Sequence, residues 1–170
     1  MRQHVLTALL VLLAAPAVAQ NPNRPSCSAP EFRQFDFWVG DWVVQDPSNG
    51  QQAGTNLVTR DFNNCVISEH WSGAQGGHGS SFNIYDRQRG VWHQTWVDDG
   101  GTLLLLDGHF DGTSMVMQSE PVARPNGARL INRITWTPLD SGRVRQHWET
   151  SNDGGTTWTT AFLGIYRPRS

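Results

Sequence analysis

Short runs in which apolar and polar residues alternate dominate the chain from about residue 38 onward. Clusters of Gly, Asn, Asp and Pro separate these runs at intervals of roughly eight to twelve residues, which is typical of all-β sandwiches and barrels. The clusters lie at 46–50, 63–64, 73–79, 87–90, 98–101, 111–112, 120–127, 138–142 and 153–155. The pattern therefore indicates an all-β domain without long helices.

The intervals between the clusters predict about ten strands, at 38–45, 54–62, 65–72, 80–86, 91–98, 102–110, 114–119, 128–137, 143–150 and 156–166. Most connections are short enough for tight hairpins, so successive strands should be antiparallel neighbours in up-and-down order. Such an order closes most simply into a barrel, which leaves room inside for one small ligand. An immunoglobulin-like sandwich is the alternative, but it needs long crossovers that this pattern lacks.

A short helix is expected before the barrel. Ser28 and Glu31 stand three residues apart around Pro30, which is the signature of a capped helix start. The sequence supports only one or two turns, ending near Asp36. We therefore expect one domain at 28–170, consisting of this helix and the barrel.

Residues 1–19 have the features of a secretory signal peptide. A basic start at 1–4 precedes an apolar run at 5–15, and 17–19 is an Ala-Val-Ala cleavage site. The run of about 11 residues is too short to span a bilayer, although an uncut membrane anchor is the alternative. We expect a periplasmic or secreted protein with a flexible leader at 20–27 and no membrane span.

The two cysteines, Cys27 and Cys65, would reach an oxidising compartment after export. We predict a disulfide between them that ties the N-terminal segment to the barrel, with two free thiols as the alternative. Their spacing excludes a C-x-x-C redox centre.

The composition mainly excludes chemistries. All 13 basic residues are arginine, so no lysine is available as a nucleophile, Schiff base or phosphate ligand. The formal charge of -2 argues against a nucleic-acid partner. The unusual feature is eight tryptophans against two tyrosines, because indole rings supply large apolar area for a core or a pocket.

Alternation along the strands predicts which side chains point into the barrel. At 143–150 the apolar face carries Val144, Gln146 and Trp148. At 91–98 we place the face with the two tryptophans inside, because the bulkiest aromatic rings gain most from burial. Glu69 shares a face with Trp71, whereas the inward face of 80–86 is ambiguous from sequence.

The predicted interior is aromatic with a few hydrogen-bonding groups, which is the profile of a ligand pocket. A packed barrel whose polar residues satisfy one another is the alternative. The candidate ligand-binding residues are Glu69, Trp71, Asn83, Tyr85, Trp92, Gln94, Trp96, Arg133, Gln146 and Trp148.

The start of the first strand carries a family resemblance. Gly40-Asp41-Trp42 is similar to the Gly-x-Trp hallmark of the lipocalin-like, or calycin, superfamily. The resemblance implies that Arg167, near the last strand, lies on the indole face of Trp42 and closes one end of the barrel. With the motifs at 35–42, 69–71, 92–98 and 151–155, the chain resembles a secreted bacterial lipocalin-like family that is catalogued as a domain of unknown function. That resemblance implies the fold and no activity.

No metal or cofactor is expected. The five histidines that follow the expected signal peptide form no recognised zinc spacing. They are His70, His78, His93, His109 and His147. Haem is the alternative, because haem-binding barrels occur among lipocalin relatives and need one inward histidine, here His70 or His78.

The segment 151–158 matches the Asp-box pattern S-x-D-x-G-x-T-W. That pattern recurs blade by blade in propellers, and one copy is too little for such a fold. We therefore expect a structural hairpin, in which Asp153 bonds the turn and Trp158 packs beneath it.

The sequence lacks a G-x-S-x-G elbow and a glycine-rich phosphate loop. The one catalytic candidate is Glu69, whose pKa would rise in an aromatic pocket. We expect an exported barrel that binds a small, partly apolar molecule. The alternatives are a general acid-base enzyme of the cyclase or isomerase type that uses Glu69, and a structural envelope protein with a filled barrel.

Overall fold

The computed structural model describes residues 27–125 and 127–169. The signal peptide expected at 1–19 and nearly all of the leader expected at 20–27 lie outside these residues. Within the described part of the chain, no helix is long and apolar enough to cross a bilayer.

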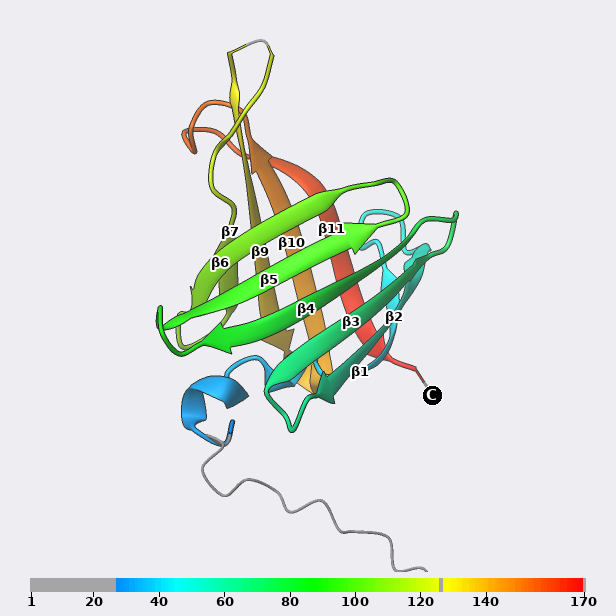
Figure 1. The fold of residues 1–170 in the computed structure, drawn as a ribbon. Helices are drawn as coiled ribbons and strands as arrows, with labels where there is room; N and C mark the ends of the chain where they lie inside the picture. Colours follow the sequence, from blue (N-terminus) through cyan, green and yellow to red (C-terminus); the bar gives the residue numbers. More distant parts are fainter. Residues whose placement is uncertain (1–26, 126, 170) are drawn as a thin grey trace, which may run out of the picture.

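Strands make up most of the described chain (Figure 1). Their bounds are β1 Gly40–Gln45, β2 Gln52–Asp61, β3 Val66–Gly73, β4 His78–Asp86, β5 Val91–Asp98, β6 Leu103–Phe110, β7 Met115–Gln118, β8 Val122–Ala123, β9 Arg129–Leu139, β10 Arg143–Ser151 and β11 Thr159–Pro168. Three short 3-10 helices complete the fold, η1 Pro30–Arg33, η2 Asp36–Trp38 and η3 Asp140–Gly142.

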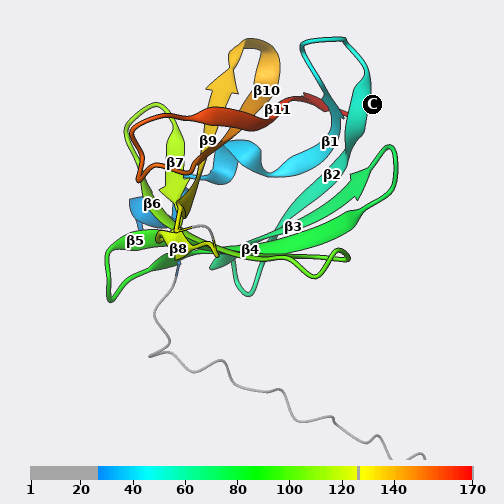
Figure 2. The same cartoon turned by 90° about the horizontal axis from the view of Figure 1, so that it is seen from above.

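All the strands except β8 form a closed antiparallel barrel (Figure 2). Each strand from β1 to β6 pairs with the next, and β7 pairs with β9. β9 pairs with β10, β10 with β11, and β11 returns to pair with β1. The short turns allow neighbours in sequence to be neighbours in space. The predicted all-β, up-and-down barrel of about ten strands is therefore confirmed.

Two local predictions need correction. The segment 120–127 was expected to be a turn, but it contains β8, which pairs with Arg129 and Leu130 of β9. The helix expected up to Asp36 is two separate 3-10 helices. The first is capped at Ala29 without a side-chain hydrogen bond, so the capping box predicted from Ser28 does not form the cap.

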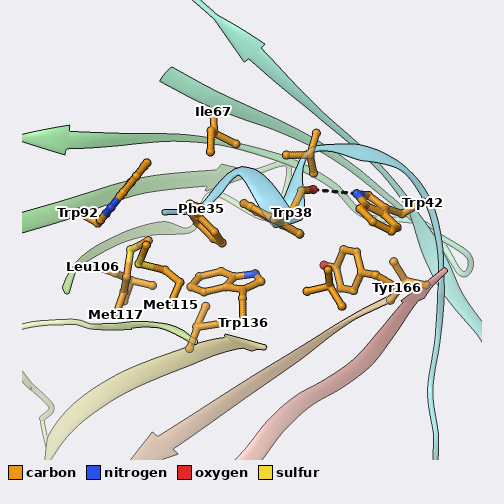
Figure 3. Close-up of a cluster of buried hydrophobic side chains, with 14 of the residues drawn as sticks. Phe35, Trp38, Trp42, Ile67, Trp92, Leu106, Met115, Met117, Trp136 and Tyr166 are labelled. Carbon is orange, nitrogen blue, oxygen red and sulfur yellow. Dashed lines mark hydrogen bonds between the residues drawn. The ribbon is translucent and has the colours of Figure 1, made fainter. Parts of the chain in front are cut away.

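The segment 30–38, which we call the plug, fills the end of the barrel at the bottom of Figure 1. Phe35 and Trp38 are both fully buried, and their rings stack with centroids 4.9 Å apart. Phe35 also meets the edges of Trp92 and Trp136, at 5.7 and 5.2 Å between centroids (Figure 3). Met115 and the other buried apolar side chains complete this half of the core. The plug therefore packs its end of the barrel with aromatic rings.

The predicted disulfide is confirmed. Cys27 and Cys65 are bonded, with their Cα atoms 5.0 Å apart. Cys65 follows the β2–β3 turn, so the bond fastens the chain just before η1 to the barrel wall. The cross-link therefore holds the N-terminal side of the plug against the end that it fills.

The Gly-x-Trp motif has a direct steric explanation. The indole of Trp42 lies over the backbone of Gly40, where a Cβ atom would be 2.7 Å from the ring. The Nε1 of Trp42 donates to the backbone oxygen of Trp38 at 2.9 Å, which joins the first strand to the plug. The prediction that Arg167 covers this indole is wrong. Arg167 is exposed opposite Val43, because alternation on β11 turns its neighbour Tyr166 inward.

Replacing Phe35 by Ala should remove the ring on which the plug is built. The loss of a buried phenylalanine costs about 3–5 kcal/mol of unfolding free energy. Urea unfolding measures this loss, with Phe37→Ala as the matched control, because Phe37 is only partly buried at the edge of the cluster. Equal losses in both variants would show that the plug has no single central ring.

Candidate ligand-binding cavity

The other half of the barrel interior contains a cavity of about 270 Å³. Six of its lining residues are sequence candidates, namely Glu69, Trp71, Gln94, Trp96, Gln146 and Trp148. The other six are Leu104, Ile134, Trp136, Ala161, Phe162 and Tyr166. These residues come from β3, β5, β6, β9, β10 and β11, so the cavity forms only when the barrel closes and brings these strands together.

Glycines in the wall make room for the aromatic rings. Trp71 leans over Gly54, where a Cβ atom would lie 2.6 Å from the indole. Trp96 occupies the space where a Cβ of Gly79 would be. Because each indole occupies the place of a neighbour's side chain, the rings lie along the wall and the space between opposite walls stays open.

A buried polar network begins at Glu69, which is only 4% exposed. Its Oε1 accepts a hydrogen bond from Asn56 Nδ2 at 2.7 Å, and its Oε2 accepts one from Ser81 Oγ at 2.6 Å. Asn83 Nδ2 donates in turn to Ser81 Oγ at 2.9 Å. Gln94 Nε2 donates to Asn83 Oδ1 at 2.8 Å. The carboxyl group is therefore held in position by β2 and β4.

The network continues on the opposite side of the barrel. Tyr166 OH donates to Gln146 Oε1 and lies 3.3 Å from Asn56 Nδ2. In these bonds Gln146 accepts with its side-chain oxygen Oε1, and Gln94 donates from its side-chain nitrogen Nε2. Within the described part of the chain, Gln146 Nε2 and Gln94 Oε1 make no hydrogen bond, although both residues line the cavity. These two atoms are a donor and an acceptor that a bound molecule could use.

Burial raises the pKa of Glu69 to about 7, and the hydrogen bonds from Ser81 and Asn56 only partly oppose this effect. None of the described residues that line the cavity is cationic. Burial and the charge of Glu69 also hold the pKa of Tyr166 well above its usual value, so its hydroxyl stays neutral. Near neutral pH, Glu69 exists in both protonation states and can take or give a proton.

The site can accommodate both states of Glu69. Asn56 Oδ1 is buried without a hydrogen-bond partner in the described residues. When Glu69 is protonated, rotation of the Asn56 amide by half a turn would let its Oδ1 accept the carboxylic proton. Glu69 therefore has a neighbour that suits either form.

Three candidate residues belong to other parts of the interior. Asn83 is buried behind Ser81 and orients Gln94 without lining the cavity. Trp92 and Tyr85 lie in the half that the plug fills. There Trp92 Nε1 donates to Gln34 Oε1 at 3.1 Å, and the ring of Tyr85 meets a plug ring edge-on at 5.4 Å.

The inward placement of Arg133 is wrong. Ile134 and Trp136 are the buried residues on this stretch of β9, so alternation turns Arg133 outward. Its Nη2 pairs with Glu149 Oε2 at 3.0 Å, and its guanidinium lies 3.8 Å from the ring centre of Trp158. Arg133 therefore stabilises the outer surface beside the Asp-box turn.

The Asp-box segment forms the β10–β11 turn. Asp153 Oδ1 accepts bonds from the backbone nitrogens of Thr156 and Thr157, at 3.0 and 2.9 Å. These bonds and the hydroxyl of Thr157 lower the pKa of Asp153. Trp158 Nε1 donates to Gly155 O at 3.0 Å. The segment is folded on itself and does not line the cavity.

Neither haem candidate is placed inside. His70 and His78 are exposed on the outer wall, where their Nδ1 atoms lie 3.1 and 3.3 Å from the hydroxyls of Ser80 and Ser72. The haem alternative needs an inward histidine, and neither of these two points inward. In residues 27–125 and 127–169, no group of three or more His, Cys, Asp or Glu side chains could hold a metal ion.

No protein-family model matches the chain, and a search of curated proteins finds no match.

Replacing Glu69 by Gln should change how stability depends on pH. In the folded protein Glu69 binds its proton up to about pH 7, whereas its ordinary pKa is 4.5. The unfolded chain therefore releases the proton first, and wild-type stability falls as the pH rises from 4.5 to 7. The unfolding free energy of Glu69→Gln minus that of wild type should therefore be about 3 kcal/mol larger at pH 8 than at pH 4.

Urea unfolding at pH 4, 6 and 8 measures that difference. Glu120→Gln, which removes an exposed carboxylate, is the control for a change in surface charge. A difference between wild type and Glu69→Gln that stays constant with pH would show that Glu69 titrates normally.

Proposed function

We propose that this chain is an exported lipocalin-like barrel that binds a small, partly apolar molecule in its central cavity. The observation that carries the proposal is an aromatic cavity of about 270 Å³ with Glu69, Gln94 and Gln146 in its lining. Binding pockets typically measure about 300–1,000 Å³ and combine apolar walls with a few placed polar groups. The cavity suits a molecule at the small end of that range.

The lining restricts the chemistry of the bound molecule. Its apolar part would pack on the indoles, and its polar part would meet the free oxygen of Gln94 and the free nitrogen of Gln146. An anion would be repelled by ionised Glu69, because no cationic group lines the described cavity to offset that charge. A neutral hydroxyl or amide, or an organic cation, fits this site better.

Export and family membership are part of the same proposal. The signal-like segment 1–19 and the disulfide between Cys27 and Cys65 support a periplasmic or secreted protein. The steric role of Gly40 under Trp42 supports the lipocalin-like assignment, since it explains why that motif opens the first strand. No nucleic acid is proposed as a partner.

General acid-base catalysis in the same cavity is the second candidate. A carboxyl group with a pKa of about 7 is well matched to proton transfer at neutral pH. Glu69 lines the cavity, so a bound molecule could reach it. A cyclase or isomerase reaction would need no further cofactor.

Native mass spectrometry of the exported protein, followed by titration with the neutral fluorophore N-phenyl-1-naphthylamine, tests binding. Trp148→Ala should weaken binding of the fluorophore about tenfold, the equivalent of 1.4 kcal/mol, because it removes one aromatic wall. Trp158→Ala is the matched control, since that indole lies outside the cavity. Loss of affinity in both variants, or in neither, would contradict the proposed site.

Glu69→Gln distinguishes binding from catalysis. The amide keeps the size of the carboxyl group and one acceptor oxygen but cannot transfer a proton at neutral pH. A binding protein should keep its affinity for the neutral fluorophore within a few-fold. A molecule retained from the periplasm that wild type converts, and Glu69→Gln binds without converting, would establish the enzyme instead.

A further inference from the structure

The barrel wall is incomplete along one side of β6. On its other side β6 pairs with β5 from Leu103 to Gly108. On the β7 side, pairing covers only Asp107–Phe110. The stretch Leu103–Leu106 therefore has no strand neighbour on that side among the described residues, although it continues the same strand.

The facing segment 119–123 is bonded elsewhere. Ser119 N donates to Asn132 O at 2.8 Å, and Asn132 N donates to Ser119 Oγ at 2.9 Å. Val122 and the rest of β8 then pair with β9. This segment runs beside β9 in the hairpin above the barrel (Figure 1), so it does not pair with β6. We call the resulting opening the wall slot.

The wall slot adjoins the central cavity. It measures about 760 Å³ and is lined by side chains from both faces of the sheet. Leu103 and Leu105 reach it from the outer face, and Leu104 and Trp148 reach it from the inner face. Leu104 and Trp148 also line the central cavity, so the two spaces share a boundary.

Exposed apolar side chains gather at the wall slot, beside charged residues such as Glu120 and Arg124. Leu103, Leu105 and Val122 are 64%, 48% and 54% exposed, although burial of such side chains is favourable. A second opening, between β11 and the β1–β2 turn, is lined mainly by polar residues such as Asp46 and Gln51. The wall slot would therefore offer more apolar contact than the second opening to an apolar chain that leaves the cavity.

We propose that the molecule bound in the central cavity is chain-like, with its polar end at Glu69 and an unbranched apolar tail that leaves through the wall slot. The tail would cover Leu103, Leu105 and Val122. This inference rests on the proposed binding function and adds the class of ligand. A cavity of about 270 Å³, the share of roughly nine water molecules, is too small to enclose such a chain completely.

An added peptide strand is the competing occupant, because Leu103–Leu106 presents a free backbone edge. Segment 119–123 already directs its backbone bonds to β9, so a peptide would gain hydrogen bonds on one side only. Its other edge would be buried against Val122 without partners, which is costly. A hydrocarbon tail has no such requirement, and the geometry favours it.

A series of 1-alkanols from hexanol to dodecanol, in competition with the neutral fluorophore, tests the inference. Each buried methylene should tighten binding about fourfold, which is 0.8 kcal/mol converted to a ratio. With a tail in the wall slot, this gain should continue to the longest alcohols. A plateau at the length that fills the central cavity would overturn the inference.

Slot variants locate the tail. Leu105→Asp and Val122→Asp should weaken binding of dodecanol at least tenfold and leave that of hexanol within twofold. Both side chains are exposed, so neither change should impair folding. Val97→Asp is the matched control, since Val97 is 49% exposed on the neighbouring strand and does not line the slot. Equal effects from all three variants would contradict the inference.

Failure of the inference can be distinguished from failure of the proposed function. If hexanol binds and Trp148→Ala weakens it, but chain length has no effect, the cavity binds small molecules and the chain-like class is wrong. If an extended apolar peptide binds and Leu105→Asp abolishes that binding without a chain-length effect, strand addition replaces the proposal. If hexanol does not bind, the proposed function fails too.

Discussion

The aromatic contact between the plug and the barrel wall determines how the rest of the interior is used. Phe35 stacks on Trp38 and meets rings from β5 and β9, so one half of the barrel is solid. The other half has no inserted segment in the described chain and is lined by side chains of the wall. Its open space therefore depends on how those side chains lie. The glycines under Trp71 and Trp96 let the rings lie along the wall, and the cavity results from that arrangement.

Glu69 gives this cavity its chemical character. A carboxyl group with no cationic neighbour in the described cavity is costly to ionise there, and its pKa of about 7 expresses that cost. Asn56 and Ser81 reduce the cost without removing it, and they fix the direction of both oxygens. The network leaves one amide atom each of Gln94 and Gln146 without a protein partner at the cavity surface, where water or a ligand can complete it.

The barrel, the disulfide and half of the cavity lining follow from the sequence, because turn clusters and strict alternation report local geometry. Alternation also holds on β2, but hydrophobicity is a poor guide to its inner face, because Leu57 is 46% exposed and Asn56 is buried. The placement of Arg167 rested on the family resemblance alone, whereas alternation with Ile134 and Trp136 already favours the outer face for Arg133. The wall slot depends on Ser119 bonding to β9 instead of β6, a choice between two neighbours that no local pattern encodes.

The two openings in the wall have a mechanical consequence. β11 pairs with β1 only from Ile165 to Pro168, and β6 pairs with β7 only from Asp107 to Phe110. Beyond these points, the ladder is interrupted on two sides of the cavity, whereas the plug and the disulfide hold the opposite end together. Around the cavity the barrel therefore consists of two sheets, β1–β6 and β9–β11, which are hydrogen-bonded to each other only toward the plugged end. Among the described residues no ladder joins the two sheets there, so a wider open half would break none of the ladder hydrogen bonds.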